Sequence, residues 1–192
     1  MTAASNKESL ELVGMAAQGD PNAQKCLIER LRKRMHGIAL SILGSALDAE
    51  DTTQAILMEI LASAGTFRGE NLLGWADRIA VRTAIRHARQ RRMRAMQCEV
   101  RDDIELVGDP VAPPDFDLVL PKTIVEYLAF LPETRRVAVV LRHVMDYTVD
   151  EIAQITEVSS NTVKDRLLHG RAQLRRLIRR DLALKSMNGS QP

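Results

Sequence analysis

Aromatic residues make up only 3% of this 192-residue chain, and it has only two cysteines. With so few aromatic rings, Leu, Ile, Val, Ala and Met must fill most of the core. Cys26 and Cys98 lie too far apart in the sequence to suggest a disulfide framework or a metal-binding cluster. No apolar run approaches the length of a membrane span, and the first residues lack the features of a signal peptide. We therefore expect a protein of a reducing cytoplasm that does not insert into a membrane on its own.

Histidines are also few, and no nucleophile or metal-ligand pattern accompanies them. His36, His87, His143 and His169 are dispersed along the chain. The sequence therefore predicts no catalytic residues, no metal site and no cofactor. An enzyme is the least expected class of function.

Positive charge is concentrated in two segments, although the net charge of the chain is only +2. Arginines crowd residues 78–94, and arginines with one lysine crowd residues 164–180. Acidic residues fill the stretch between them, from residue 99 to residue 117. Two basic segments on either side of an acidic one predict contact with a polyanion at two places.

The apolar residues recur every three to four positions in almost every patterned segment, which is typical of helices, and no alternating strand pattern is present. The fold class is therefore all-α. We expect two small helical domains, residues 1–96 and 121–185, joined by a flexible, acidic, proline-containing linker over residues 97–120. Residues 186–192 should form a disordered tail.

A short loop and a long helix are expected in the second half of the first domain. Glycines bound a predicted loop over residues 65–74, and a long arginine-rich helix should follow from Trp75 to about Met96. Asp48 is a possible N-cap of the helix that precedes this loop.

The segment from Thr148 to Leu174 has the pattern of two short helices joined by a tight turn. Thr148 and Glu151 have the spacing of a capping box. Val158 anchors the turn, and Ser159 is a suitable N-cap for the second helix. The second helix has an apolar inner stripe and a largely basic outer face, so the pattern predicts a helix-turn-helix that enters a DNA major groove. The alternative is a plain helical hairpin with a solvated basic face.

Four motifs follow one another along the chain: AAQGDPNAQ at residues 16–24, DAEDTTQ at residues 48–54, the segment 67–92 that begins FRGENLL, and EIAQITEVSSNTVKDRLLHGR at residues 151–171. Their order resembles that of the extracytoplasmic-function group of bacterial sigma factors. In that family they correspond to the opening helix junction, the core-binding motif of region 2, the promoter-melting loop and helix, and the region 4 helix-turn-helix.

The resemblance implies a factor that binds core RNA polymerase and directs promoter recognition, melting and initiation at a stress or signal regulon. Asp48, Glu50, Asp51 and Gln54 would bind the clamp helices of the largest polymerase subunit, and the second domain would meet the flap of the second-largest subunit. An anti-sigma factor is a further implied partner. Without the resemblance, the acidic residues could equally serve only helix capping and solubility.

Promoter DNA is the second implied partner, contacted at two elements. Phe67 is a candidate for stacking on a flipped base, although it could instead fill the core, as could Trp75. The −10 element would be contacted by Phe67, Arg68, Asn71, Trp75, Arg78, Arg82, Arg86 and Arg89. The −35 element would be contacted by Ser160, Asn161, Thr162, Lys164, Asp165, Leu168, His169 and Arg171.

Four residues depart from the family pattern in the helix-turn-helix, and one of them is Thr156, which replaces a usual Leu. Glu157 stands where the family usually has Gly, and a left-handed backbone there would cost about 1 kcal/mol. Asp165 places an acid on the reading helix, where it could accept a hydrogen bond from cytosine but would repel phosphate. His169 replaces a usual Arg. Promoter preference therefore does not transfer from relatives. Two alternatives stay open: a sigma-like decoy that titrates an anti-sigma factor, and a stand-alone helix-turn-helix regulator.

Overall fold

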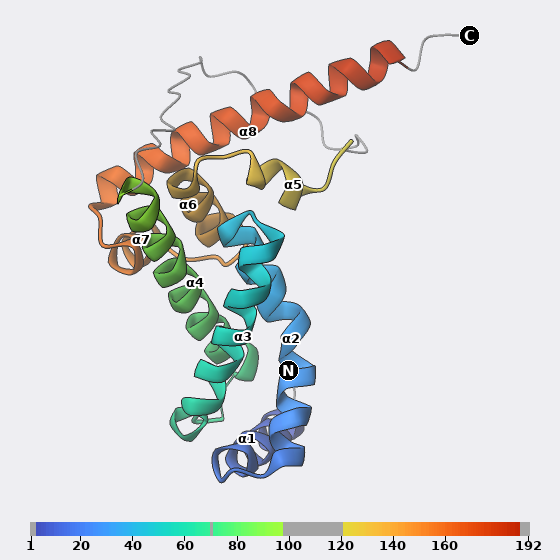
Figure 1. The fold of residues 1–192 in the computed structure, drawn as a ribbon, viewed down its shortest axis with the longest axis vertical. Coiled ribbons are helices and arrows are strands. Elements are labelled where there is room, and N and C mark those ends of the chain that lie inside the picture. Colours follow the sequence, from blue (N-terminus) through green and yellow to red (C-terminus); the bar gives the residue numbers. More distant parts are fainter. Residues whose placement is uncertain (1–2, 70, 98–120, 189–192) are drawn as a thin grey trace. The chain divides into compact units, whose positions relative to one another are not determined.

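The computed structural model describes residues 3–69, 71–97 and 121–188. Within these ranges the chain is helical, with no β-strand, which confirms the predicted all-α class (Figure 1). It divides into two compact units, residues 1–92 and 93–192. The predicted linker lies outside the described residues beyond Gln97, as does the last part of the predicted tail. None of the helices in the described ranges is both long enough and apolar enough to span a membrane.

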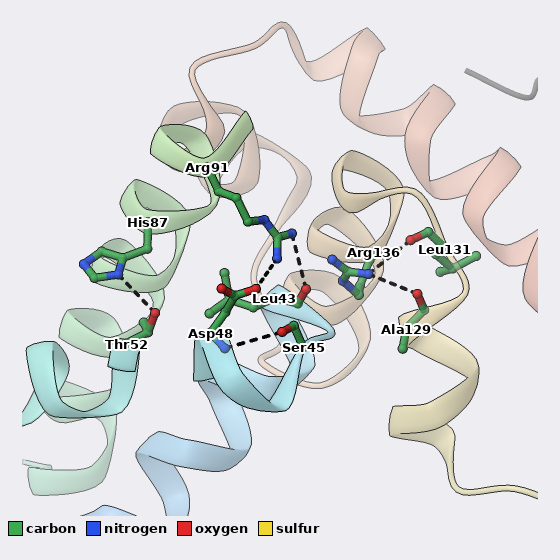
Figure 2. Close-up of polar contacts among 9 residues, drawn as sticks. All are labelled: Leu43, Ser45, Asp48, Thr52, His87, Arg91, Ala129, Leu131 and Arg136. Atoms are coloured by element: carbon green, nitrogen blue, oxygen red, sulfur yellow. Dashed lines mark hydrogen bonds and ion pairs between the residues drawn. The ribbon is translucent and has the colours of Figure 1, made fainter. Parts of the chain in front are cut away.

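The first unit contains α1 (Ala3–Ala17), α2 (Pro21–Leu43), α3 (Ala46–Ala62), the 3-10 helix η1 (Ala64–Thr66) and most of α4 (Leu72–Gln97). Helix α1 packs against α2 and η1, and α2 packs against α3. Helices α3 and α4 lie side by side, joined by side-chain hydrogen bonds (Figures 1 and 2).

Local sequence determines where α2 begins and ends. Asp20 caps the helix by accepting a hydrogen bond from the Ala23 N–H at 2.8 Å, and Pro21 occupies the first turn. Gly44 ends the helix in a left-handed conformation with φ 68°, which glycine adopts without a steric penalty. The next helix is capped by Ser45, whose hydroxyl accepts from the Asp48 N–H. The prediction that Asp48 is the cap is therefore wrong: this residue lies within the first turn of α3.

The core of the first unit is built from aliphatic side chains. The residues with almost no exposed surface include Leu27, Leu31, Met35, Ile42, Ile56, Ile60 and Val81. One charged pair also lies at the edge of this core. Arg34 of α2 donates two hydrogen bonds to the two carboxylate oxygens of Asp77 in α4, both at 2.7 Å. This fork-shaped pairing fixes α4 against α2.

The second unit contains α5 (Ile124–Ala129), α6 (Glu133–His143), α7 (Val149–Thr156) and α8 (Ser160–Asn188), and the first three all contact α8. Helix α8 extends three residues into the predicted tail. The buried guanidinium of Arg136 donates to the carbonyl oxygens of Ala129 and Leu131, at 3.3 and 3.1 Å (Figure 2). It thereby holds the end of α5 against α6.

Helices α6 and α8 cross closely at Gly170. This residue is buried, and a Cβ atom added to it would lie 2.8 Å from Cγ2 of Val139. A larger residue at this point of the crossing would therefore force Val139 or one of the two helices to shift. The close approach fixes the rotation of α8 about its axis and decides which of its residues face outward.

Candidate functional sites

The four candidate binding residues of α3 do not have equivalent structural roles. They are Asp48, Glu50, Asp51 and Gln54. Asp48 is half-buried, and its carboxylate accepts a hydrogen bond from Arg91 of α4 at 2.6 Å (Figure 2). Burial opposes the charged form of Asp48, but its hydrogen bonds with Ser45 and Arg91 outweigh this effect and lower the pKa of the carboxyl group. Asp48 therefore joins two helices of its own unit.

The other three residues of the motif face solvent. Glu50 lies 3.8 Å from Arg32 in an exposed ion pair, with side chains 63% and 69% exposed. Asp51 and Gln54 are exposed, and neither side chain has a hydrogen-bond or ion-pair partner among the described residues. Glu50 and Gln54 also line a shallow groove between α2 and α3. A protein partner can therefore reach these three side chains without any rearrangement of the fold.

Two large apolar residues flank this polar surface on α3. Leu47 and Met58 are 79% and 71% exposed. Together with Asp51 and Gln54 they recur at intervals of three to four residues, so the four side chains lie on one face of the helix. Leu47 and Met58 are not among the residues that the sequence motif predicts for this surface. The sequence does indicate their exposure, since each is a large apolar residue outside the apolar stripe that faces the core.

The loop after α3 is shorter than predicted. The segment over residues 65–74 overlaps η1 at one end and the first turn of α4 at the other, so the predicted loop boundaries are wrong. Asn71 explains the early start of α4, because its side-chain oxygen accepts a hydrogen bond from the Gly74 N–H at 3.0 Å. The Arg68 side chain, which is exposed, donates to the carbonyl oxygen of Gly65 at 3.2 Å.

Phe67 lies in this loop but is buried, with only 7% of its surface exposed. Its ring centroid lies 5.3 Å from that of Trp75, at an interplanar angle of 51°, an ordinary geometry for a packed aromatic pair. Little of the Phe67 ring is available to stack on a base in this conformation. The structure thus favours the alternative in which Phe67 belongs to the core, and Trp75 is half-buried beside it.

The arginines predicted for the −10 element lie along α4. Arg78, Arg82 and Arg86 recur every four residues and are exposed, whereas Arg89 is half-buried. Arg86 also forms an exposed ion pair with Glu59 at 3.3 Å. The exposed guanidinium groups form a basic stripe along one helix, which is suited to contact with successive phosphates. Their role in DNA binding stays a prediction.

The helix-turn-helix begins with the predicted capping box. The Glu151 carboxylate accepts from the Thr148 N–H at 2.8 Å, and the Thr148 hydroxyl accepts from the Glu151 N–H at 3.3 Å. Ser159 caps the second helix by accepting from the Thr162 N–H at 3.1 Å. Glu157, in the turn, has φ 54° and ψ 44°. This residue is therefore left-handed, as the family's usual glycine would be.

The residues predicted for the −35 element divide between two roles at the start of α8. Ser160 is half-buried and donates to Asp150 at 2.7 Å, and Thr162 is half-buried with its hydroxyl 2.9 Å from that of Ser159. These two side chains fix the helix start. The exposed members of the predicted set are Asn161, Lys164, Asp165, Leu168 and Arg171. They form the outward face of the second helix, opposite the buried Val163 and Leu167.

Two of the departures from the family pattern interact with each other. His169 Nε2 lies 3.2 Å from Asp165 Oδ1, one helical turn away. The comparison with the family pattern alone does not connect the two residues. Their spacing of four residues was the signal that could have paired them.

Two interactions in the first unit were also missed: the pairing of Arg91 with Asp48 and that of Arg34 with Asp77. Asp77, which stands where the family frequently has Tyr, lies between the apolar residues of a helix face that packs into the core, and a charge at such a position requires a partner. In the parts of the chain that the structure describes, no three His, Cys, Asp or Glu side chains come together as a metal site would require.

Comparison with known proteins identifies both units. The Sigma-70 region 2 family matches residues 27–94, and the Sigma-70 region 4 family matches residues 122–174. The sigma factor SigV of Bacillus subtilis is 32% identical over 155 residues, which cover 79% of this chain and 89% of SigV. The extracytoplasmic-function sigma factor SigM of Mycobacterium tuberculosis is 27% identical over 173 residues, which cover 90% of this chain and 85% of SigM.

Among solved structures, the fold is similar to that of the sigma factor RpoE from Bartonella quintana, which was crystallised in complex with the anti-sigma factor NepR. The TM-score is 0.53 at 22% sequence identity, and the match covers 81% of this chain and 96% of the RpoE chain.

Proposed function

The chain belongs to the extracytoplasmic-function sigma factors of RNA polymerase, and on this premise we propose that it binds core polymerase and directs promoter recognition, melting and transcription initiation. The observation that carries the proposal is that a region 2 unit and a region 4 unit occur in one chain, in the family order. Each unit also presents an accessible polar surface of the kind that its proposed partner requires.

Core polymerase is the proposed partner of the outer face of α3. Asp51 and Gln54 are exposed, so their polar groups can pair with basic side chains on the clamp helices of the largest subunit. Leu47 and Met58 add apolar surface on either side of them, and burial of both would contribute to affinity. Asp48 acts indirectly in this proposal, because its carboxylate is already engaged by Arg91.

The basic stripe of α4 is the proposed contact with the −10 element. Arg78 and Arg82 project into solvent and can pair with phosphates, while Arg68 and Asn71 lie exposed at the preceding loop. Phe67 and Trp75 would support this loop from beneath as a packed pair. A base extruded from the duplex would then be held by the loop and by the polar residues around it.

The outward face of α8 is the proposed reader of the −35 element. A recognition helix places the residues of its N-terminal half against base edges in the major groove, and here those residues are Asn161, Asp165 and Leu168. Lys164 and Arg171 lie beside them and can pair with phosphates. Each DNA contact alone is modest. Binding of both units to one polymerase would make the second contact intramolecular and so raise the overall specificity.

We assign the chemistry of RNA synthesis to the polymerase, so this chain would act as a binding factor in the cytoplasm. An anti-sigma factor is a further proposed partner, supported by the presence of such a factor on the structurally similar RpoE. It would compete with polymerase for the same exposed faces.

Run-off transcription with purified core polymerase tests the proposal. The chain should direct specific transcripts from a fragment library of its own genome, and core polymerase alone should not. Asp51→Arg should abolish association with core polymerase, because it places a positive charge opposite the basic partner surface. Glu11→Arg makes the same change in charge at an exposed residue of α1. It is the matched control and should bind core polymerase normally. Arg171→Ala should also bind core polymerase normally but weaken promoter use.

The alternatives predict different results. A decoy would bind an anti-sigma factor and start no transcript from any fragment. A stand-alone regulator would bind an operator tightly in moderate salt without polymerase. Unchanged core association in the Asp51→Arg variant would show that the proposed polymerase surface is wrong.

A further inference from the structure

The outward face of α8 carries a carboxylate that lies within ion-pair distance of a histidine. Asp165 and His169 lie on consecutive turns, with His169 Nε2 3.2 Å from Asp165 Oδ1. The Asp165 side chain is 66% exposed, and that of His169 is 36% exposed. No further partner contacts the Asp165 carboxylate within the described parts of the chain. One carboxylate oxygen therefore lies within ion-pair distance of the His169 ring, and the other remains able to accept a hydrogen bond.

A carboxylate in a major groove discriminates strongly between bases. Cytosine presents an amino group as a donor there, whereas guanine presents two acceptors, and thymine presents one acceptor and a methyl group. Adenine presents a donor next to an acceptor, and this acceptor would face the carboxylate unfavourably. Cytosine is thus the base whose major-groove edge best matches an aspartate.

We propose that Asp165 selects a cytosine in the −35 element and that His169 positions the Asp165 carboxylate. This proposal rests on the proposed function. The His169 ring restrains the carboxylate before DNA binds, so less conformational entropy is lost on contact. When it is protonated, the ring at 3.2 Å also offsets part of the repulsion between the carboxylate and the DNA phosphates. Neither effect is available to an unpaired aspartate on an exposed helix.

The position of the selected cytosine is restricted by the neighbours of Asp165. Asn161 lies one turn before it on the same exposed face, and Leu168 lies one turn after it. One helical turn rises about 5.4 Å, while successive base pairs are spaced about 3.4 Å apart along the DNA axis. The cytosine should therefore lie within about two base pairs of the positions that respond to substitution of Asn161 or Leu168.

Transcription-based selection with holoenzyme tests the proposal. Core polymerase with the full chain would transcribe a promoter library whose −35 region is randomised, and the templates of the recovered transcripts would be sequenced. The wild-type chain should enrich cytosine at one position by about tenfold, a discrimination within the range of one direct base contact. Asp165→Ala should abolish this preference at that position alone. Asp165→Asn should change it to adenine, because an amide pairs with both the donor and the acceptor of that base.

The positioning role of His169 requires its own variants. His169→Ala should reduce the cytosine enrichment without changing its position, and His169→Gln, which retains a donor, should restore part of it. Asp146→Asn removes one negative charge, as Asp165→Asn does, but from an exposed residue outside the recognition helix. It is the matched control and should leave the selected sequence unchanged.

Each outcome has a distinct meaning. If wild-type holoenzyme transcribes the library but Asp165→Ala selects the same base with the same enrichment, the cytosine assignment is wrong and the sigma function stands. A preference that depends on Asp165 for any base other than cytosine overturns it equally. Unchanged enrichment in His169→Ala refutes the positioning role. A failure of the wild-type chain to transcribe any library member contradicts the proposed function itself.

Discussion

Replacement of Glu157 by glycine should stabilise the second unit. Glu157 has φ 54° and ψ 44°, a left-handed conformation that costs a residue with a Cβ atom about 1–2 kcal/mol. Glycine removes this cost but gives the unfolded chain more freedom, which returns about 0.4–1 kcal/mol. The net increase in the free energy of unfolding should therefore be about 0.5–1 kcal/mol.

Glu157 takes part in a further interaction, so a second variant is needed to isolate the backbone effect. Glu157→Ala removes the rest of the side chain but keeps a Cβ atom. Glu157→Gly should therefore be more stable than Glu157→Ala by about 1 kcal/mol. In urea, this difference corresponds to a shift in the unfolding midpoint of roughly 0.5 M.

The fluorescent residues allow each unit to be followed separately. The only tryptophan, Trp75, lies in the first unit, and both tyrosines, Tyr127 and Tyr147, lie in the second. The Glu157 variants should shift the tyrosine transition and leave the tryptophan transition unchanged. Equal tyrosine midpoints for the Gly and Ala variants would refute the argument that backbone strain at this turn reduces stability.

Three further predictions concern contacts inside each unit that stabilise its fold. Arg34→Ala should lower the free energy of unfolding of the first unit by about 1–3 kcal/mol, because it leaves a buried carboxylate without its partner; tryptophan fluorescence in urea measures this. The hydrogen bond from Lys122 to Asp181, at 2.7 Å, lowers the pKa of the Asp181 carboxyl. The contribution of this hydrogen bond to the free energy of unfolding should be fully present above the ordinary aspartate pKa of about 4. It should be lost as the pH falls through the lowered pKa of Asp181 in the folded state. Lys122→Met should remove most of that dependence from the tyrosine-monitored midpoint, and an unchanged pH profile would contradict the assignment. Gly170→Ala should destabilise the second unit by about 1–3 kcal/mol, since its Cβ would lie 2.8 Å from Val139. Val139→Ala should restore part of the loss in a thermal melt, and a double variant no more stable than Gly170→Ala would count against the clash.

Local signals in the sequence were sufficient wherever a few neighbouring residues determine the structure. The Asp20–Pro21 start of α2 and the capping box of Thr148 and Glu151 both form as expected, because caps satisfy backbone groups within one turn. The loop before α4 was predicted too long because Asn71 was not recognised as a cap. The N-cap of α3 was assigned three residues too late for a similar reason: two candidate side chains, Ser45 and Asp48, lie within one turn of each other.

The sequence by itself determined the helical class, the order of the motifs and the presence of a polar motif on α3 and a recognition helix on α8. These follow from periodicity and from the spacing of neighbouring residues, which the chain carries in linear form. Only the tertiary structure decided which members of each motif are available to a partner. It engages Asp48 with Arg91 and buries Phe67 beside Trp75, while Asp51 stays exposed. The physical reason is that exposure and pairing depend on contacts between helices distant in sequence, which no local pattern encodes.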